Sequence, residues 1–475
     1  MTPLPATSLL CPRDMVELSA GQKCFSLGIF TGPPIVPPPQ TDKHIAPVPP
    51  DVSGHQRRVV TGGISWRRTF SAFQYRNYRL YFIGQLVSLI GTWMTNTAQG
   101  WLVYQLTGSK ALLGIVAAAG TAPMLFFSTW GGWAADRFPK RSVLICTQTV
   151  MMILAFIFAG LVWSGQIVPW EIIVLGLLGG VVMAFDMPAR QSFVVEIASR
   201  EDLMNAISLN SAMFNGARIV GPAIAGFLMA KVGIALCFFI DGASFIAVLV
   251  GLFLMRVTPP PRSGAAGGAL AQSLEGFRYV WNHTRVRTIF ALFAVVGVFG
   301  WSYSVLMPAF AHDILHLGEQ GYGLLLGAIG VGALVGALAT AAFGSSISSR
   351  RLAFGGVWLF SAMLFIFSLN RNLTIAMICL AGAGFGMMLF FSTSNTTVQT
   401  IVPDEMRGRV MGIWSLIFGG MIPFGSLEAG AVAHYFGTPA TLTVGAIVCA
   451  LAGGVTYVIV RRRDAQLAQT ANLSS

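Results

Sequence analysis

The sequence predicts an all-α membrane protein of twelve transmembrane helices in two pseudo-symmetric halves of six. Only 10% of the 475 residues are charged and 55% are hydrophobic, whereas soluble domains carry roughly 25% charged residues. Twelve apolar runs are long enough to cross a bilayer, which takes about 20 helical residues. A long basic segment separates the first six runs from the last six.

The formal charge of +12 would indicate a nucleic-acid partner in a soluble protein. Here the positions of the charges argue against one. Of the 27 Lys and Arg residues between 57 and 463, 23 fall in inner loops and flanks if the first run exits outward. Lys110, Lys231 and Arg371 fall outside, and Arg218 lies within a run. This bias follows the positive-inside rule and predicts that both ends are cytoplasmic, with anionic lipid as the partner of the basic loops.

The chain begins with a segment unlike the rest. Eleven of the 23 prolines lie in the first 50 residues, so residues 1–64 are predicted to be a disordered proline-rich tail. The tail lacks the pattern of a signal peptide. Residues 65–79 are basic and aromatic, and they are predicted to form an amphipathic lead-in at the inner interface.

The apolar runs then follow in two groups. The N-terminal half, 80–255, has runs near 80–106, 111–135, 142–164, 167–188, 203–230 and 233–255. Residues 256–286 form a cytoplasmic central loop with a short amphipathic helix near 270–281. The C-terminal half, 287–460, has runs near 287–312, 321–344, 352–369, 373–396, 408–434 and 440–460. Residues 461–475 form a basic cytoplasmic tail.

A weak internal repeat relates the halves. VVEIASREDLMNAIS after the fourth run and VQTIVPDEMRGRVMG after the tenth lie about 204 positions apart. This alignment pairs Glu201 with Glu405 and Asn205 with Arg409. Two such halves are expected to hold a substrate site between them near the bilayer midplane.

Two predicted helices carry polar rows on one face. The row on the first helix is Gln85, Ser88, Thr92, Asn96 and Gln99. The row on the fifth helix is Ser208, Ser211, Asn215 and Arg218. Spacings of three and four place each row on one side, where it either joins helices by hydrogen bonds or lines a wet path. The length of the first row, nearly five turns, favours a substrate path.

Charged residues inside the spans are the next candidates. Arg218 lies deep in the fifth helix and requires a partner. Asp241, at similar depth on the sixth helix, is the predicted partner, in a structural ion pair or in a substrate or proton site. Glu428, toward the outer end of the eleventh helix and near His434, is the second candidate for proton coupling, or only an interfacial acid.

The loop at 131–141 reads GGWAADRFPKR. Its order G-x-x-x-D-R-x-x-K-R resembles the loop between the second and third helices of the major facilitator superfamily of secondary transporters, although Pro139 replaces the usual Gly. The resemblance implies a conformational latch in which Asp186, at the end of the fourth helix, pairs with Arg137 or Arg141. The latch residues implied are Gly132, Asp136, Arg137, Lys140, Arg141 and Asp186. A basic loop that only orients the protein is the alternative.

The fifth helix contains GPAIAG, with Gly221, Pro222 and Gly226. Small residues permit close helix approach, and Pro222 leaves a backbone carbonyl without its donor. The run resembles the motif that seals the periplasmic side in proton-linked exporters of this superfamily, with Ala225 in place of a Gly.

Longer strings resemble one bacterial branch of the superfamily. They are RNYRLYFIGQLVSLIGTWM and PARQSFVVEIASREDLMNAISLNSAMFNGARIVGPAIAG, and the branch contains enterobactin exporters and macrolide-efflux permeases. The resemblance implies the major facilitator fold and export of drug-like or siderophore-like amphipathic molecules across the bacterial inner membrane, by alternating access and proton antiport. A proton-coupled importer and a non-transporting scaffold or sensor stay as alternatives.

The sequence contains no enzyme signature and no phosphate loop of the kind that binds ATP. We therefore predict no enzyme activity and transport driven by an ion gradient. Six cysteines without C-x-x-C spacing predict neither a metal site nor a disulfide framework. The expected partners are a small-molecule substrate, protons and lipid, with no cofactor, and the expected state is a monomer.

Overall fold

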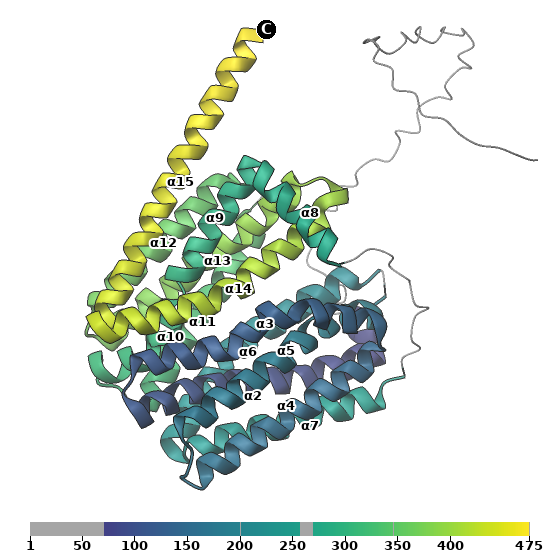
Figure 1. Ribbon diagram of the computed structural model, residues 1–475, viewed down its shortest axis with the longest axis vertical. Coiled ribbons are helices and arrows are strands. Elements are labelled where there is room, and N and C mark those ends of the chain that lie inside the picture. The colour runs from purple at the N-terminus through teal and green to yellow at the C-terminus, as the bar shows by residue number, and fades with distance from the viewer. Residues whose placement is uncertain (1–70, 200, 257–268, 345, 475) are drawn as a thin grey trace, which may run out of the picture. The chain divides into compact units, whose positions relative to one another are not determined.

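The computed structural model of the chain is helical throughout the part that it describes, residues 71–474 apart from 200, 257–268 and 345 (Figure 1). The N-terminal half consists of η1 (Ser71–Gln74), α2 (Arg76–Thr107), α3 (Lys110–Arg137), α4 (Lys140–Trp163), α5 (Pro169–Ile197), α6 (Leu203–Lys231) and α7 (Ile234–Leu254). The predicted tail, 1–64, lies outside the described residues.

The C-terminal half follows the short helix α8 (Ala269–Asn282). It consists of α9 (Thr284–Phe299), α10 (Ser302–Ala309), the π-helical turn η2 (Phe310–Ile314), α11 (Glu319–Phe343), α12 (Ser349–Leu369), α13 (Leu373–Ile401), α14 (Asp404–Phe436) and α15 (Thr438–Ser474). α9, α10 and η2 form one interrupted span. We call the end of the bundle that holds the start of α2 the inner end, following the predicted topology, and the opposite end the outer end.

Twelve helical spans are present, as predicted. Eleven of them are long and apolar enough to cross a membrane by length and composition. The twelfth is α2, whose 32 residues include the predicted polar row, which lowers its hydropathy. α2 packs against α6 and α7 inside the N-terminal half, so its place in the bundle is that of a span.

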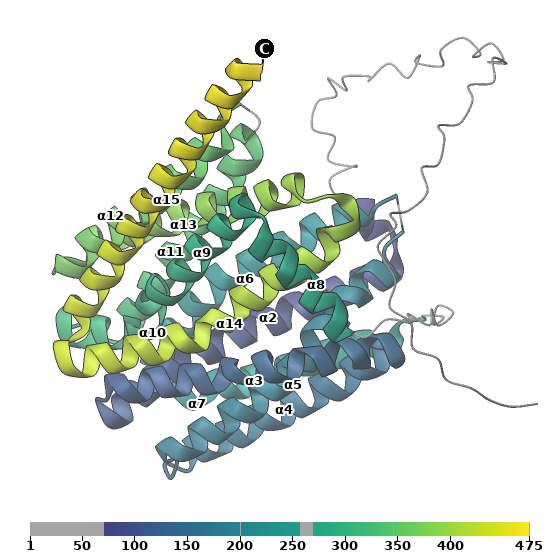
Figure 2. The ribbon, with the colours of Figure 1, turned by 45° about the horizontal axis from the view of Figure 1, so that its top comes forward.

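The two halves repeat one packing pattern. In the N-terminal half α2 packs on α6 and α7, α3 on α5, and α4 on α5 and α7. In the C-terminal half α9 packs on α14 and α15, α11 on α13, and α12 on α13 and α15. When the spans of each half are counted from one to six, the same pairs of spans are in contact in both halves. Figures 1 and 2 show the two sets of helices side by side. The predicted pseudo-symmetry is confirmed.

A short segment is docked on the fifth helix of each half. In the N-terminal half the backbone N–H of Ala72, in η1, donates to Asn205 Oδ1 at 3.1 Å. In the C-terminal half Glu275 of α8 pairs with Arg409 of α14 at 2.8 Å. Asn205 and Arg409 are the residues that the sequence repeat aligns, so the repeat extends to the segment that precedes each half.

The predicted end of the fourth span, at 188, is wrong. α5 continues to Ile197, so Asp186 lies inside the helix and is not its solvated end. Pro188 lacks the N–H that would satisfy the carbonyl of Ala184. Gly131 of α3 packs directly against that carbonyl, so the helix continues past the proline in a close-packed setting.

Candidate functional site

The seam between the halves is formed by two helix pairs, α3 with α14 and α6 with α11. Near the outer end each pair meets at glycines. A side chain on Gly430 would lie 2.9 Å from the Cα of Gly114, and one on Gly226 would lie 3.0 Å from the Cα of Gly323. Because neither contact leaves room for a Cβ atom, the backbones touch directly, as in other small-residue helix crossings.

The predicted fifth-helix motif lies in this region. A Cβ on Gly323 would be 2.6 Å from the carbonyl oxygen of Pro222. Gly221 faces inward to its own half, where it contacts Trp93 of α2. The carbonyl that Pro222 leaves without a helical donor belongs to Arg218, and it faces Gly330 of α11. The motif therefore lies at the contact between the halves.

Side chains reinforce the outer end of the seam. Trp101 stacks on Tyr322 with ring centroids 5.4 Å apart and donates its Nε1–H to Glu319 at 3.2 Å. Tyr104 donates to Asp313 Oδ2 at 2.5 Å, and Lys110 Nζ lies 3.5 Å from the same oxygen. The sequence did not single out these residues, because the partners are more than 200 positions apart and no local spacing relates them.

The inner ends of the halves are not bridged in this way. Lys140 pairs with Glu196 at 3.0 Å, within the N-terminal half. Asp404 and Arg407 pair within α14. Across the described residues, no ion pair or side-chain hydrogen bond joins the two halves at the inner end. Among the described residues, the glycine contacts and polar bridges between the halves thus lie at the outer end, and the ion pairs of the inner end lie within one half.

The predicted pairing of Asp186 with Arg137 or Arg141 is wrong. Asp186 is only 1% exposed, and its carboxylate binds Arg190 one helical turn later. Arg141 instead donates to the carbonyl of Leu252 at 2.7 Å. The i, i+4 spacing of Asp186 and Arg190 is a sequence signal that would have found this pair.

Two neighbours on α4 complete the hydrogen bonding of Asp186. Thr147 and Gln148 donate to Oδ1 at 2.7 and 2.8 Å. A buried carboxylate is stable only when it is paired and hydrogen-bonded, and here both conditions are met inside one half.

The other latch residues lie at the surface of the inner end. Asp136 is exposed and forms no ion pair with another described residue. Arg137 lies over the ring of Trp133 at 5.8 Å. A side chain on Gly132 would meet no atom within 4 Å, so the close helix approach belongs to Gly131. A latch role for these residues stays a prediction.

The polar row of the first helix divides between core and surface. Gln85 and Ser88 are 3% and 1% exposed, so they are packed within the N-terminal half. Thr92 and Gln99 are half-buried and Asn96 is exposed. Only the outer part of the row therefore reaches a surface.

The polar row of the fifth helix is more open. Ser208 and Ser211 are exposed and Asn215 is half-buried. Asn215 donates its Nδ2 hydrogen to the Ser211 carbonyl at 2.9 Å, within its own helix. These side chains present a polar surface toward the inner end of α6.

The predicted ion pair between Arg218 and Asp241 is wrong. Arg218 lies over Trp93 at 5.9 Å and interacts electrostatically with the Tyr303 phenol of α10. Asp241 is 4% exposed, packs against Gly91 of α2, and its Oδ1 has no hydrogen-bond partner. The estimate of similar depth from 1.5 Å per residue did not fix the rotation of either helix, and the two side chains face different neighbours.

An aromatic patch of the C-terminal half lies next to Arg218, and the sequence analysis missed it. Tyr303 contacts Trp301, which contacts Phe418, at centroid distances of 6.3 and 6.5 Å. Phe418, 41% exposed, contacts Phe391 at 5.8 Å. The patch, Trp301, Tyr303, Phe391 and Phe418, joins three helices, so its members could not be grouped from local spacing.

Glu428 differs from the paired acids of the inner end. It is half-buried near Cys449 of α15, and its Oε2 has no hydrogen-bond partner. His434 is exposed beside Tyr435. Asp241 and Glu428 are therefore two intramembrane carboxylates that have no cationic partner among the described residues. Among the same residues, no group of three His, Cys, Asp or Glu side chains could hold a metal ion.

Three curated proteins are similar to this chain in sequence. The multidrug efflux pump Tap of Mycolicibacterium fortuitum is 29% identical over 400 residues, covering 82% of this chain and 97% of that protein. The staphyloferrin A transporter of Staphylococcus aureus is 26% identical over 406 residues, covering 82% and 98%. The enterobactin exporter EntS of Shigella boydii is 25% identical over 351 residues, covering 71% and 80%.

Solved structures agree on the fold. The nucleoside transporter NupG matches with a TM-score of 0.65 at 14% identity, covering 81% of this chain and 98% of its own. A bacterial homologue of the human lysosomal transporter Spinster matches with a TM-score of 0.65 at 15% identity, covering 82% and 97%. The family model described as "transmembrane secretion effector" matches residues 67–473. The chain therefore belongs to this family of multi-pass bacterial membrane transporters, within the major facilitator superfamily.

Proposed function

We propose that this transporter exports amphipathic small molecules, of drug-like or siderophore-like chemistry, by alternating access coupled to proton antiport across the bacterial inner membrane. The observation that carries the proposal is the position of Arg218. It lies just inside the glycine contacts of the outer end, with the polar residues of α6 on one side and the aromatic patch on the other.

This arrangement fits a molecule with two kinds of surface. The guanidinium of Arg218 would bind an anionic or hydrogen-bond-accepting end of the substrate. The exposed ring of Phe418 and its neighbours would bind an aromatic or aliphatic part, because rings offer large apolar areas with few rotatable bonds. Both surfaces lie between the halves, where a change in their relative tilt would move the site from one side of the membrane to the other.

Asp241 and Glu428 are the two candidates for the proton carrier, and we propose that Asp241 fills this role. An isolated buried carboxylate is far more stable neutral than charged, so an oxygen without a partner is a place to hold a proton. Asp241 fits this role better, because it is 4% exposed and packs against Gly91 of α2, the helix that carries the first polar row. Glu428 is half-buried and lies near Cys449 of α15.

Export is favoured over import by the relatives. Tap is named an efflux pump and EntS an exporter, and the fifth-helix motif resembles that of exporters. A proton-coupled importer is the alternative, and it would carry the substrate into the cell.

Everted membrane vesicles test the proposal. We expect an anionic aromatic dye, fluorescein, or a cationic one, ethidium, to accumulate when the vesicle interior is made acidic, and a protonophore to abolish the accumulation. Asp241→Asn should remove the response to the pH gradient, whereas Glu428→Gln should keep it. Uptake by right-side-out vesicles alone would show import. Unchanged coupling in Asp241→Asn would overturn the assignment of the proton carrier.

A further inference from the structure

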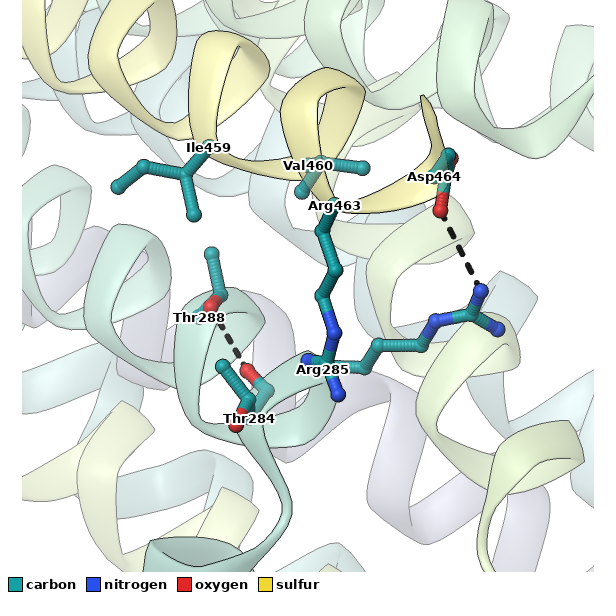
Figure 3. Close-up of a pocket in the computed structure, with 7 residues that line it drawn as sticks. All are labelled: Thr284, Arg285, Thr288, Ile459, Val460, Arg463 and Asp464. Carbon is teal, nitrogen blue, oxygen red and sulfur yellow. Dashed lines mark hydrogen bonds and ion pairs between the residues drawn. The ribbon is translucent and has the colours of Figure 1, made fainter. Parts of the chain in front are cut away.

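A recess at the inner end of the C-terminal half lies outside the proposed path. It is formed between the start of α9 and the last turns of the α15 span (Figure 3). Its lining consists of Thr284, Arg285, Thr288, Ile459, Val460, Arg463 and Asp464. The volume of about 20 Å³ admits one or two water-sized groups, such as the oxygens of a phosphate.

The positive charges of the recess are unevenly matched. Asp464 accepts from Arg285 at 3.3 Å and is also paired with Arg350 of α12. Arg463 points from α15 toward the first turn of α9 (Figure 3), and its Nη1 is buried without a hydrogen-bond partner. Two guanidinium groups thus share one carboxylate. A buried donor of Arg463, in the same lining, has no acceptor, which is costly unless a ligand supplies one.

The backbone adds to this field. α9 begins at Thr284, and the side chain of the capping residue His283 accepts no hydrogen bond from the helix. The first N–H groups of a helix have no partner inside it, and they carry the positive end of its dipole. This helix end faces the same recess as Arg463, so backbone and side chain attract negative charge at one place.

The depth of the recess matches that of lipid headgroups. Ile459 is 47% exposed and lies one turn toward the membrane from Arg463. Trp281, 61% exposed, packs under Arg287 at 5.7 Å beside the start of α9. Exposed Trp at the end of a span is typical of the headgroup layer, and basic pockets between helices at this level bind anionic headgroups.

We propose that the recess is a phosphate-binding site, occupied by the headgroup of an anionic phospholipid with its acyl chains along Ile459. Arg463 donates to the phosphate, and the start of α9 faces it. The bound lipid would join α9 and α15, the first and last spans of the C-terminal half. A soluble phosphate ester shares the same chemistry and is the second source to be tested.

Lipid binding to the purified full-length protein tests the site, measured by native mass spectrometry. Phosphatidylglycerol is compared with phosphatidylcholine and with free glycerol phosphate. Arg463→Gln should weaken phosphatidylglycerol binding about tenfold or more, the loss of one charge-assisted hydrogen bond. Arg462→Gln is the matched control, since Arg462 is an exposed neighbour on the same helix, and its loss should change binding less than twofold.

The thermal stability of each variant without lipid separates a binding defect from misfolding, and Arg463→Lys, which keeps the charge, should recover part of the affinity. If glycerol phosphate binds with the same dependence on Arg463, the recess is a phosphate site whose ligand is a soluble phosphate ester and not a lipid. Equal losses in Arg463→Gln and Arg462→Gln would overturn the proposal, as would phosphatidylcholine binding as tight as that of phosphatidylglycerol.

Discussion

The outer and inner ends of the seam between the halves are built from different contacts. At the outer end the backbones of Gly226 and Gly323 touch, and Lys110 reaches Asp313 across the seam. At the inner end the charges of the described residues pair within their own half. Contact at the outer end thus depends on fit between surfaces, and in the proposed alternating-access cycle each half would keep its inner-end contacts as it moves.

The predicted latch residues follow the pattern of the inner end, because none of them contacts the C-terminal half through an ion pair or side-chain hydrogen bond between described residues. Asp136 is exposed and Arg141 binds the end of α7 in its own half. A latch at the inner end would have to form when the inner ends meet, and the outer contacts would then have to separate. The following predictions test the two ends separately.

The largest effect is expected at the glycine contact. A Cβ on Gly226 would lie 2.8 Å from the Glu319 carbonyl oxygen, and overpacking of this kind costs about 1–3 kcal/mol. Gly226→Ala should therefore open the outer end and lower transport at least about fivefold. Spin labels at Leu106 and Gln320, both exposed, should report a longer distance across the seam.

Gly216→Ala is the matched control, because a side chain at this position of the same helix meets no atom within 4 Å. Alanine also favours the helix over glycine by roughly 0.5–1 kcal/mol, so the control should fold at least as well. Similar label distances in the two variants would show that backbone contact does not close the outer end.

Next in size is the effect of Arg218. Arg218→Gln removes the charge between Trp93 and Tyr303 and should raise the substrate KM about tenfold, as for a lost charge-assisted hydrogen bond. Arg218→Lys keeps the charge but loses the planar group that stacks on aromatic rings, so its substrate KM should lie between those of the wild type and Arg218→Gln. Vesicle uptake measured over a range of dye concentrations would separate KM from the maximal rate. An unchanged KM in Arg218→Gln would remove Arg218 from the path.

Local sequence patterns predicted the fold more completely than the site. Apolar runs and basic loops predicted twelve spans in two halves, because each span must satisfy its own backbone in lipid. The GPAIAG run was placed correctly at a close helix contact, since small residues carry that signal locally.

Features that depend on rotation or distant pairing were missed. The row at Gln85 and Ser88 was expected along the path, but helix packing buries it. The contacts of Asp313 and Glu319 were not predicted, because their partners belong to the other half. A single sequence does not relate such positions, whereas the i, i+4 pair of Asp186 and Arg190 was available and was overlooked.

A smaller effect is expected from the charge pair of the outer end. Lys110 and Asp313 are 25% and 30% exposed, and exposed pairs contribute about 0.2–1 kcal/mol. Lys110→Gln should therefore shift the outer-closed population by at most about fivefold, and high salt should reduce the difference from the wild type. Arg371→Gln, at another exposed outer cation, is the control for general charge. A shift as large as that of Gly226→Ala would show that charge, not fit, closes the outer end.

The smallest effect concerns Asp202, which belongs to one half only. Hydrogen bonds from Ser71, Tyr75 and Gln74 lower the pKa of Asp202 below its ordinary value of 3.8. Its contribution to stability is therefore full at neutral pH and is lost as the pH falls through the lowered pKa. The melting temperatures of wild type and Asp202→Asn should differ at pH 7, and the difference should begin to shrink below about pH 4 and vanish only below the lowered pKa.

Glu201→Gln, at the exposed neighbour of Asp202, should melt like the wild type at each pH. Because η1 and the start of α6 both belong to the N-terminal half, Asp202→Asn should leave the distance between labels at Leu106 and Gln320 unchanged. A change in that distance would mean that the docking of η1 is coupled to the outer end, and the halves would then not move as independent bodies.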